Sequence, residues 1–345
     1  MPPDTTLATL SDDLTNAATA IYLFAALAFA AVLAYRRTRE TTKVEAPAAR
    51  TVERVLVGVG AGITETPAET PAPPARVAEP PQRAGMFNAD SLSKYALGLT
   101  IVGWLVQMAA LTTRGLAADR PPWANMYEFV CAVVFAAVTA LLVLFTRYRA
   151  YYLGVFVMFP AVLGMGMATT ALYTPVSALQ PSLQSYWLAI HVLAAIIATG
   201  SFTVATALTA LSLYRGSERG RNATTKSTSG LSTLAALATR LPSAASLERL
   251  GRQTIVFAFP IWTFAIIAGA IWADSAWGRY WGWDPKEVWA FITWVVYAAY
   301  LHAQATAGWR GRRSAMIAIA GYACLMINLI GINIWGSGLH SYAGV

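Results

Sequence analysis

Charged residues are scarce in this chain. Only 12% of its 345 residues are Asp, Glu, Lys or Arg, whereas 57% are hydrophobic, and the mean hydropathy is +0.50. A typical soluble domain carries about twice this share of charge. The composition therefore excludes a soluble enzyme or binding domain and predicts an all-α fold, a polytopic transmembrane helix bundle.

Cysteine is almost absent as well. Cys131 and Cys324 both lie in apolar runs, and no C-x-x-C pair exists. We interpret both residues as buried structural thiols. The chain is therefore not expected to contain a thiol relay or a covalent attachment site, and any cysteine chemistry would belong to a partner or a substrate.

Eight apolar runs are long enough to cross a bilayer as helices. We expect them at residues 14–35, 92–113, 123–145, 151–173, 186–214, 254–272, 285–307 and 315–335. Pro160 is expected to kink the fourth helix. Two short amphipathic helices are expected on the membrane surface, at residues 231–237 and 245–250.

The chain divides into three parts. Residues 1–39 are expected to form an N-terminal transmembrane anchor; its basic residues follow the apolar run, whereas a cleaved signal peptide would carry them before it. Residues 40–90 are rich in Ala, Pro, Thr and Glu and are expected to form a disordered cytoplasmic linker. Residues 91–345 form the membrane core, with an external loop at about residues 273–288.

Basic residues gather between alternate apolar runs. Of the 25 Lys and Arg residues, all but Arg114, Arg120, Arg279 and Lys286 fall in the segments that eight spans place inside. By the positive-inside rule, both termini and the external loop then face outward. The same distribution explains the net charge of +8 without nucleic acid, which is not expected as a partner.

Aromatic residues are concentrated in the external loop. Trp277, Trp281 and Trp283 occur within seven positions, in the stretch Trp-Gly-Arg-Tyr-Trp-Gly-Trp-Asp that ends at Asp284. Three indoles cannot all be buried in one small loop, so flat apolar faces stay available for a large flat ligand such as a porphyrin.

This motif, W-G-x-x-W-x-W-D, resembles the signature of the WWD family of haem-handling membrane proteins in cytochrome c maturation. The segment Asn125-Met126-Tyr127-Glu128 is similar to a second feature of that family, N-x-Y-E. It is either an interfacial aromatic belt with Asn125 as a helix cap or a structural element near the haem site. Length and surroundings look most like the CcsA/ResC type, also called CcsB, which belongs to System II. The linker at 40–90 lies outside the resemblance.

Three histidines occur in the chain, and two of them are expected near the external loop. His191 lies about five residues, or ~8 Å, into its helix from the outer face, and His340 follows the last helix. Two imidazoles from different helices can bind both axial positions of a haem iron that lies on the aromatic surface. For each histidine, the alternative is a packed or hydrogen-bonded helix contact.

His302 is expected at a different depth. It lies about 15 residues beyond Glu287, or ~22 Å down the helix, and cannot share an iron with the outer pair. One imidazole is half of a bis-histidine site, and the resemblance implies that a ResB-type partner supplies the other ligand.

Charged residues flank the tryptophans. Asp284 is expected to cap the following helix, with Pro285 at its first position and Glu287 completing a capping box. It is also a candidate haem-binding residue, and the two roles are compatible because a fixed cap also fixes how the loop presents its tryptophans. Arg279 and Lys286 are candidates to pair with haem propionates; the alternative is contact with lipid headgroups.

The resemblance implies a function in cytochrome c biogenesis. Haem b, the substrate, would reach an inner site at His302 and move outward, and the chain would then present it to the C-x-x-C-H segment of apocytochrome c for thioether attachment. The protein would be a subunit of a cytochrome c synthase (haem lyase) in the plasma membrane, and it would need no nucleophile of its own. Expected partners are a ResB-type membrane protein, apocytochrome c, the lipid bilayer and thiol-reducing proteins of the pathway.

Three alternatives stay open. A haem-delivery protein would load a haem chaperone without ligation, although such relatives are shorter or much longer than this chain. A polytopic solute transporter would show internal repeats and charges at the midplane, which the sequence lacks apart from His302. A membrane scaffold would leave the clustered tryptophans and histidines unexplained.

Overall fold

The computed structural model describes residues 4–44, 89–177, 183–217, 241–336 and 338–339. These residues form helices and connecting loops and contain no strand. The helices are α1 (Thr5–Val44), α2 (Ala89–Ala118), α3 (Met126–Tyr148), η1 (Tyr151–Leu153), α4 (Gly154–Thr170), α5 (Tyr186–Gly216), α8 (Ala244–Trp277), α9 (Pro285–Ala305), α10 (Arg312–Met326), the π-helix η3 (Ile327–Gly331) and α11 (Ile332–Trp335).

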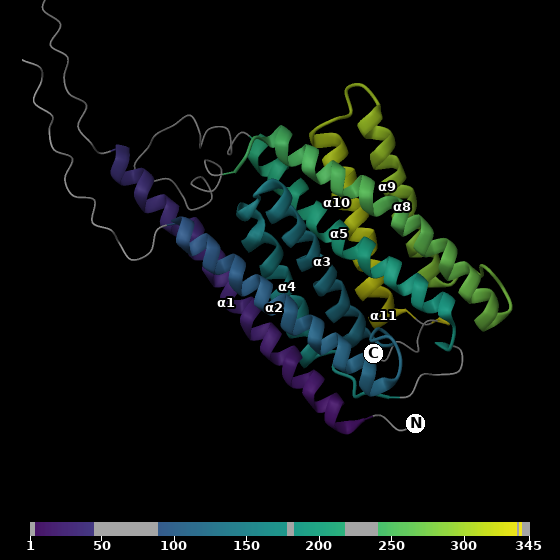
Figure 1. Ribbon diagram of the computed structural model, residues 1–345. Coiled ribbons are helices and arrows are strands. Elements are labelled where there is room, and N and C mark those ends of the chain that lie inside the picture. Colours follow the sequence, from purple (N-terminus) through teal and green to yellow (C-terminus); the bar gives the residue numbers. More distant parts are fainter. Residues whose placement is uncertain (1–3, 45–88, 178–182, 218–240, 337, 340–345) are drawn as a thin grey trace, which may run out of the picture.

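Within these residues, seven helices are long and apolar enough to cross a membrane. The eighth, α9, has 21 residues and lies between α8 and α10 in Figure 1. The predicted all-α bundle of about eight spans is thus confirmed. The outward orientation of the termini stays a prediction.

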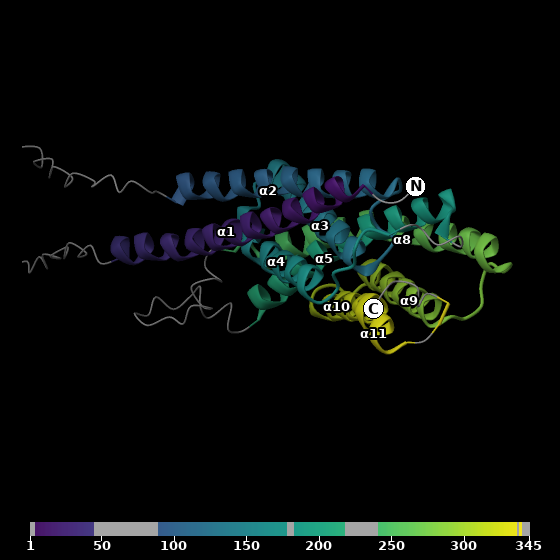
Figure 2. The same cartoon turned by 90° about the horizontal axis from the view of Figure 1, so that it is seen from below.

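The helices form three layers. Figure 2 shows α1 and α2 on one side, α9 and α10 on the other, and α3, α4, α5 and α8 between them. Two of the inner helices approach closely at Gly200 of α5, where a Cβ would lie 2.7 Å from the backbone nitrogen of Ala137 in α3. On the other side of α5, the ring of Phe202 stacks on Tyr297 of α9 at 3.9 Å. α5 therefore lies at the centre of the core.

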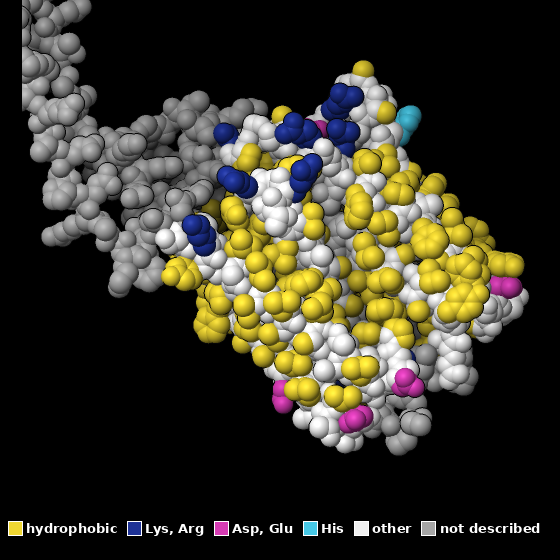
Figure 3. Space-filling model, in the orientation of Figure 1, with side chains coloured by type: hydrophobic (Ala, Val, Ile, Leu, Met, Phe, Trp, Pro, Cys, Tyr) yellow, Lys and Arg dark blue, Asp and Glu magenta, His cyan; other side chains and the backbone are white. Residues whose placement is uncertain are grey.

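The charges separate along the bundle. In Figure 3, Lys and Arg gather at one end, most of the visible Asp and Glu lie at the opposite end, and apolar side chains cover the surface between them. The α9–α10 connection lies at the basic end, whereas the α8–α9 connection and the start of α1 lie at the other (Figure 1). An apolar belt between two polar ends fits a bilayer, and the protein is a multi-pass membrane protein.

Buried charges attach the α1–α2 pair to the core. Arg114 of α2, with 3% of its side chain exposed, binds Glu128 of α3 at 3.0 Å and Asp12 of α1 at 3.1 Å. It also donates to the backbone oxygen of Thr174. Asp12 accepts a 2.6 Å hydrogen bond from Tyr173, and this bond raises the pKa of the tyrosine. The fully paired cluster joins three helices at the acidic end of the bundle.

Several predicted boundaries were wrong. Residues 245–250 are not a separate surface helix but the first turns of α8, which begins ten residues earlier than expected because Glu248 accepts hydrogen bonds from Gln304 and the backbone of Gly311. Since α8 continues to Trp277 and α9 begins at Pro285, the external loop is shorter than the expected 273–288. Residues 40–44 and 89–90 of the expected linker belong to α1 and α2. The rest of the linker, the helix at 231–237 and His340 lie outside the described residues.

The two cysteines differ in how far they are buried. Cys131 is buried as expected, whereas Cys324 is only half-buried. Pro160 does lie inside α4, and α8 contains Pro260 in the same way.

Candidate functional site

A cavity of about 1240 Å³, including its open mouth, lies at the acidic end of the bundle. Its walls come from α3, α5, α8, the α8–α9 loop, α9 and η3. The predicted site residues among its lining are His191, Trp277, Trp281 and Lys286. The cavity is open at its mouth and is lined mainly by apolar side chains, as binding sites for small molecules usually are.

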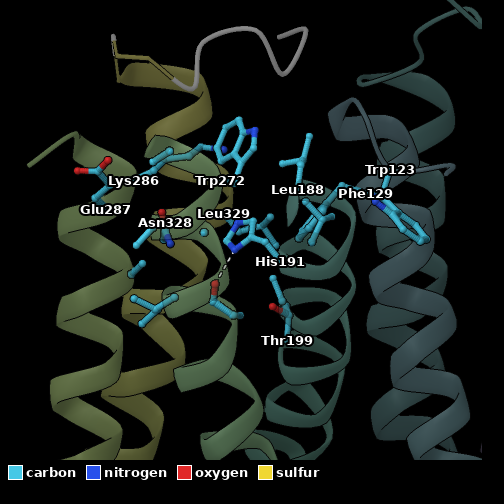
Figure 4. A pocket seen from close by; sticks show the side chains of 18 of the residues that line it. Trp123, Phe129, Leu188, His191, Thr199, Trp272, Lys286, Glu287, Asn328 and Leu329 are labelled. Carbon is cyan, nitrogen blue, oxygen red and sulfur yellow. Dashed lines mark hydrogen bonds between the residues drawn. The ribbon is translucent and has the colours of Figure 1, made fainter. Parts of the chain in front are cut away.

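His191 points into the middle of this cavity (Figure 4). Its Nδ1 lies 2.7 Å from the backbone oxygen of Ala265 in α8. Because a carbonyl only accepts, Nδ1 carries the proton and the lone pair is on Nε2. Gly269, one helical turn above, leaves room for the ring, since a Cβ there would lie 2.7 Å from Nδ1. The backbone of α8 thus fixes both the tautomer and the orientation of the imidazole.

Aromatic rings lead from His191 to the loop. The imidazole is nearly parallel to Trp272, with ring centroids 6.4 Å apart and an interplanar angle of 14°. Trp272 in turn contacts Trp277 edge-on at 4.8 Å. Trp272 is fully buried and was not predicted as a site residue, although it lies five positions before the motif. One wall of the cavity is therefore a row of flat rings.

Glu287 holds the loop that carries the other tryptophans. Its Oε2 accepts hydrogen bonds from the backbone of Gly282 at 2.8 Å and of Asp284 at 3.0 Å. These two residues flank Trp283, whose φ of 60° is unusual for a bulky side chain. The carboxylate therefore stabilises the turn that leaves Trp283 exposed, edge-on to Trp281 at 5.9 Å. Trp283 does not line the cavity.

Asp284 has two roles in the fold. It caps α9, accepting from the backbone of Lys286 at 3.2 Å, and both halves of the predicted capping box are present. Its other oxygen accepts from the backbone of Leu339 at 2.8 Å. Leu339 immediately precedes His340 in the sequence, so Asp284 ties the motif to the chain next to the third histidine. The sequence contained no signal for this contact.

The N-x-Y-E segment forms part of the opposite wall. Asn125 caps α3 by accepting from the backbone of Glu128 at 2.9 Å, as the cap interpretation predicts. Trp123, Asn125 and Phe129 also line the cavity. The segment therefore both caps a helix and lines the same cavity as Trp277 and Trp281.

Two basic residues lie at the loop. Arg279 is 3.4 Å from Glu287, and its guanidinium lies over Trp277 at 5.8 Å from the ring centroid. It does not line the cavity. Lys286 does, and Figure 4 shows its chain extending toward Trp272.

His302 lies far from this cavity. It is near the end of α9 at the basic end of the bundle, and its side chain is exposed. No group of three or more His, Cys, Asp or Glu residues that could hold a metal ion occurs in the described parts of the chain.

The cavity thus has aromatic walls around an oriented imidazole, at one end of a membrane helix bundle. A family model described as cytochrome C assembly protein matches residues 123–340. The chain belongs to this family, and its role is in cytochrome c biogenesis. The matched region contains the whole cavity and begins at Trp123, after α1 and α2.

Individual relatives agree with this assignment. The cytochrome c biogenesis protein CcsA of Gloeobacter violaceus is 34% identical over 305 residues, covering 75% of this chain and 89% of the relative. CcsA of a Synechococcus strain is 36% identical over 275 residues, covering 74% and 88%.

A solved structure shares the fold. Cytochrome c Heme Lyase CcmF superposes with a TM-score of 0.55 over 95% of this chain and 47% of the neighbour, at 17% identity. At that identity, the likeness concerns the fold alone.

Proposed function

We propose that this protein holds haem b at the outer face of the plasma membrane and presents it for thioether attachment to apocytochrome c. The observation that carries the proposal is the environment of His191. An imidazole whose Nδ1 donates to a backbone carbonyl keeps the lone pair of Nε2 for a metal, and histidines that bind a metal almost always donate their other ring N–H in this way. The surrounding indoles supply the flat faces on which a porphyrin stacks.

The residues of the cavity fit haem in three ways. His191 offers an axial ligand, and His340 is proposed as the second, since its neighbour Leu339 is bound to Asp284. Trp277 and Trp281 offer apolar faces, and Lys286 a positive charge for a propionate. Trp283 and Arg279, which lie at the loop but outside the cavity, are proposed to contact the edge of the substrate nearest the solvent.

The chain would contribute to the reaction by orienting the haem. The two thioether bonds form between the vinyl groups of haem and the cysteine thiols of the client, so no nucleophile is required from this chain. The protein's own part is to hold the iron, to keep the porphyrin against the tryptophans and to leave the vinyl edge accessible to the C-x-x-C-H segment.

His302 is proposed to belong to an inner site through which haem enters. His302 is exposed in the last turn of α9, at the basic end of the bundle, and is therefore accessible to a partner chain. A ResB-type membrane protein that supplies a second histidine would bury His302 and complete a bis-histidine site. Together the two chains would form the cytochrome c synthase. We propose that residues 1–39 serve as a membrane anchor, which the ion pair between Asp12 and Arg114 attaches to the core, and that residues 40–90 are a cytoplasmic linker.

The test is to purify the full-length protein together with its ResB-type partner and record the visible spectrum. The expected result is a complex with bound six-coordinate haem that attaches it to a C-x-x-C-H apocytochrome. A colourless complex would contradict haem handling. A coloured complex that passes haem only to a soluble chaperone, without thioether formation, would favour the delivery alternative.

A further inference from the structure

Asn328 is a polar side chain in the wall of the cavity, and the function proposed above does not use it. It lies in η3, and its Oδ1 is buried without a hydrogen-bond partner among the residues that the structure describes. An amide left unpaired in an apolar wall is destabilising, because water no longer satisfies it. In native proteins such a buried group calls for an explanation, such as a bound water, ion or ligand, or a role in the site.

The backbone around Asn328 is also unusual. Residues Ile327–Gly331 form a π-helix between α10 and α11, and such single turns are rare and occur frequently at functional sites. Asn333, four residues after Leu329, differs from Asn328: its amide donates to the backbone oxygen of Leu329 and lies 3.0 Å from the sulfur of Met126. The side chain of Asn333, in α11, is thus held by hydrogen bonds within the fold. Asn328, in η3, lines the cavity, and its Oδ1 has no partner among the described residues.

Lys286 lies on the same wall. Figure 4 shows Lys286 of α9 and Asn328 of η3 on one side of His191, opposite Leu188 and Phe129. The nearby carboxylates are engaged elsewhere: Glu287 accepts from the loop backbone, and Asp284 from the backbones of Lys286 and Leu339. Within the described part of the chain, no carboxylate lies within 4.0 Å of the Lys286 ammonium.

From these observations we propose that Asn328 and Lys286 together bind one carboxylate of the haem. This inference rests on the proposed function and adds Asn328 as a substrate-binding residue. The Lys286 ammonium has three donors, which suffice for the carboxylate and for Asn328 Oδ1, while Asn328 Nδ2 donates a second hydrogen bond to the carboxylate. A cation and an amide donor on one wall form a receptor for an anion, and they fix how the porphyrin is rotated in its own plane.

The experiment compares two ligands that differ only in whether their carboxylates are free or esterified. Full-length protein, depleted of haem, is titrated with haem and with haem dimethyl ester, which has no free carboxylate. The wild type is expected to bind haem more tightly. Asn328→Leu should weaken haem binding about tenfold and leave binding of the ester unchanged, because the variant loses a hydrogen bond to a charged group. Asn328→Asp should weaken haem binding further, since two carboxylates then repel each other.

Asn333→Leu is the matched control. It should reduce the amount of folded protein but change the two ligand affinities by the same factor. Equal weakening of haem and ester by Asn328→Leu would overturn the proposal in favour of a purely structural amide. Tighter haem binding by Asn328→Asp would overturn it in favour of an acceptor role. If the wild type binds haem and ester equally well, the carboxylate is not recognised, whereas binding of neither ligand would contradict the proposed function itself.

Discussion

His191 and His302 are both histidines in membrane helices, but the protein surrounds them very differently. His191 lies in a cavity, with Nδ1 held 2.7 Å from a carbonyl and its ring nearly parallel to a buried indole. His302 is exposed near the opposite end of the bundle, and its side chain makes no hydrogen bond to any other described residue. One imidazole is oriented by its own chain; the other is not.

Under the proposed function, this difference corresponds to two kinds of iron site. An oriented ligand costs little entropy when the metal binds, so the outer cavity can retain haem by itself once it is filled. An exposed ligand needs a second chain to bury it and to supply the opposite axial position. On this account, His302 controls whether haem enters the complex, and His191 controls how haem is held afterwards.

The largest expected effect separates the two histidines by haem content. His302→Ala should deplete haem from the whole complex, including the outer cavity, because that cavity is filled downstream of the inner site. The measurement is the amount of haem per complex after purification with the ResB-type partner. Normal haem content in this variant would show that the outer cavity is filled by another route. It would contradict the proposed difference between His302 and His191.

A smaller loss is expected for His191→Ala. Haem should remain partly bound, held by the indoles and the other imidazole, with a changed spectrum and without attachment to apocytochrome. Added imidazole should partly restore the spectrum because it can occupy the vacant axial position in an open cavity. His302→Ala should respond much less to imidazole. Equal losses in both variants without rescue would favour one buried site.

Asp284 allows the outer site to be altered without touching a ligand. Asp284→Ala removes the cap of α9 and the hydrogen bond to Leu339, and a lost cap destabilises by about 1 kcal/mol. We expect a lower melting temperature together with an outer haem spectrum that resembles that of His340→Ala. Asp284→Asn keeps a hydrogen-bond acceptor, so its melting temperature and its spectrum should lie between those of the wild type and of Asp284→Ala. A spectrum unchanged in Asp284→Ala would mean that the contact with Leu339 does not position the neighbouring histidine.

Gly269→Ala should give the smallest of these effects. The new Cβ would lie 2.7 Å from His191 Nδ1, so the ring must shift and its bond to Ala265 weakens. Disturbing such an outer contact typically lowers metal affinity by about tenfold. The control is Gly166→Ala in α4, where a Cβ meets nothing within 4 Å. If both variants retain haem alike, the orientation of His191 is not set by α8.

Local features of the sequence predicted much of this structure. Helix positions followed from apolar runs, and the Asn125 and Asp284 caps followed from residue types within one turn of the chain. The start of α8 was missed, since its first turns are held by Gln304 and Gly311, which lie far away in the sequence.

The site was predicted less completely. His191 and the tryptophans of the motif could be found because their residue types are rare and clustered. Trp272 and Asn328 were missed, because only helix packing brings them to the cavity. The same limit applies to the carbonyl of Ala265, whose role depends on a contact that spans 74 residues. Sequence patterns indicated the candidate iron ligands, whereas the groups that orient them could be identified only from the fold.

The most direct test of the account replaces the proposed iron ligand by another ligand. In the purified complex, a redox titration of the outer haem compares the wild type with His191→Met. If His191 binds the iron, exchange of imidazole for thioether should raise the reduction potential while haem content stays near that of the wild type, because methionine ligation favours the reduced iron. An unchanged potential at full haem content would show that His191 is not an axial ligand.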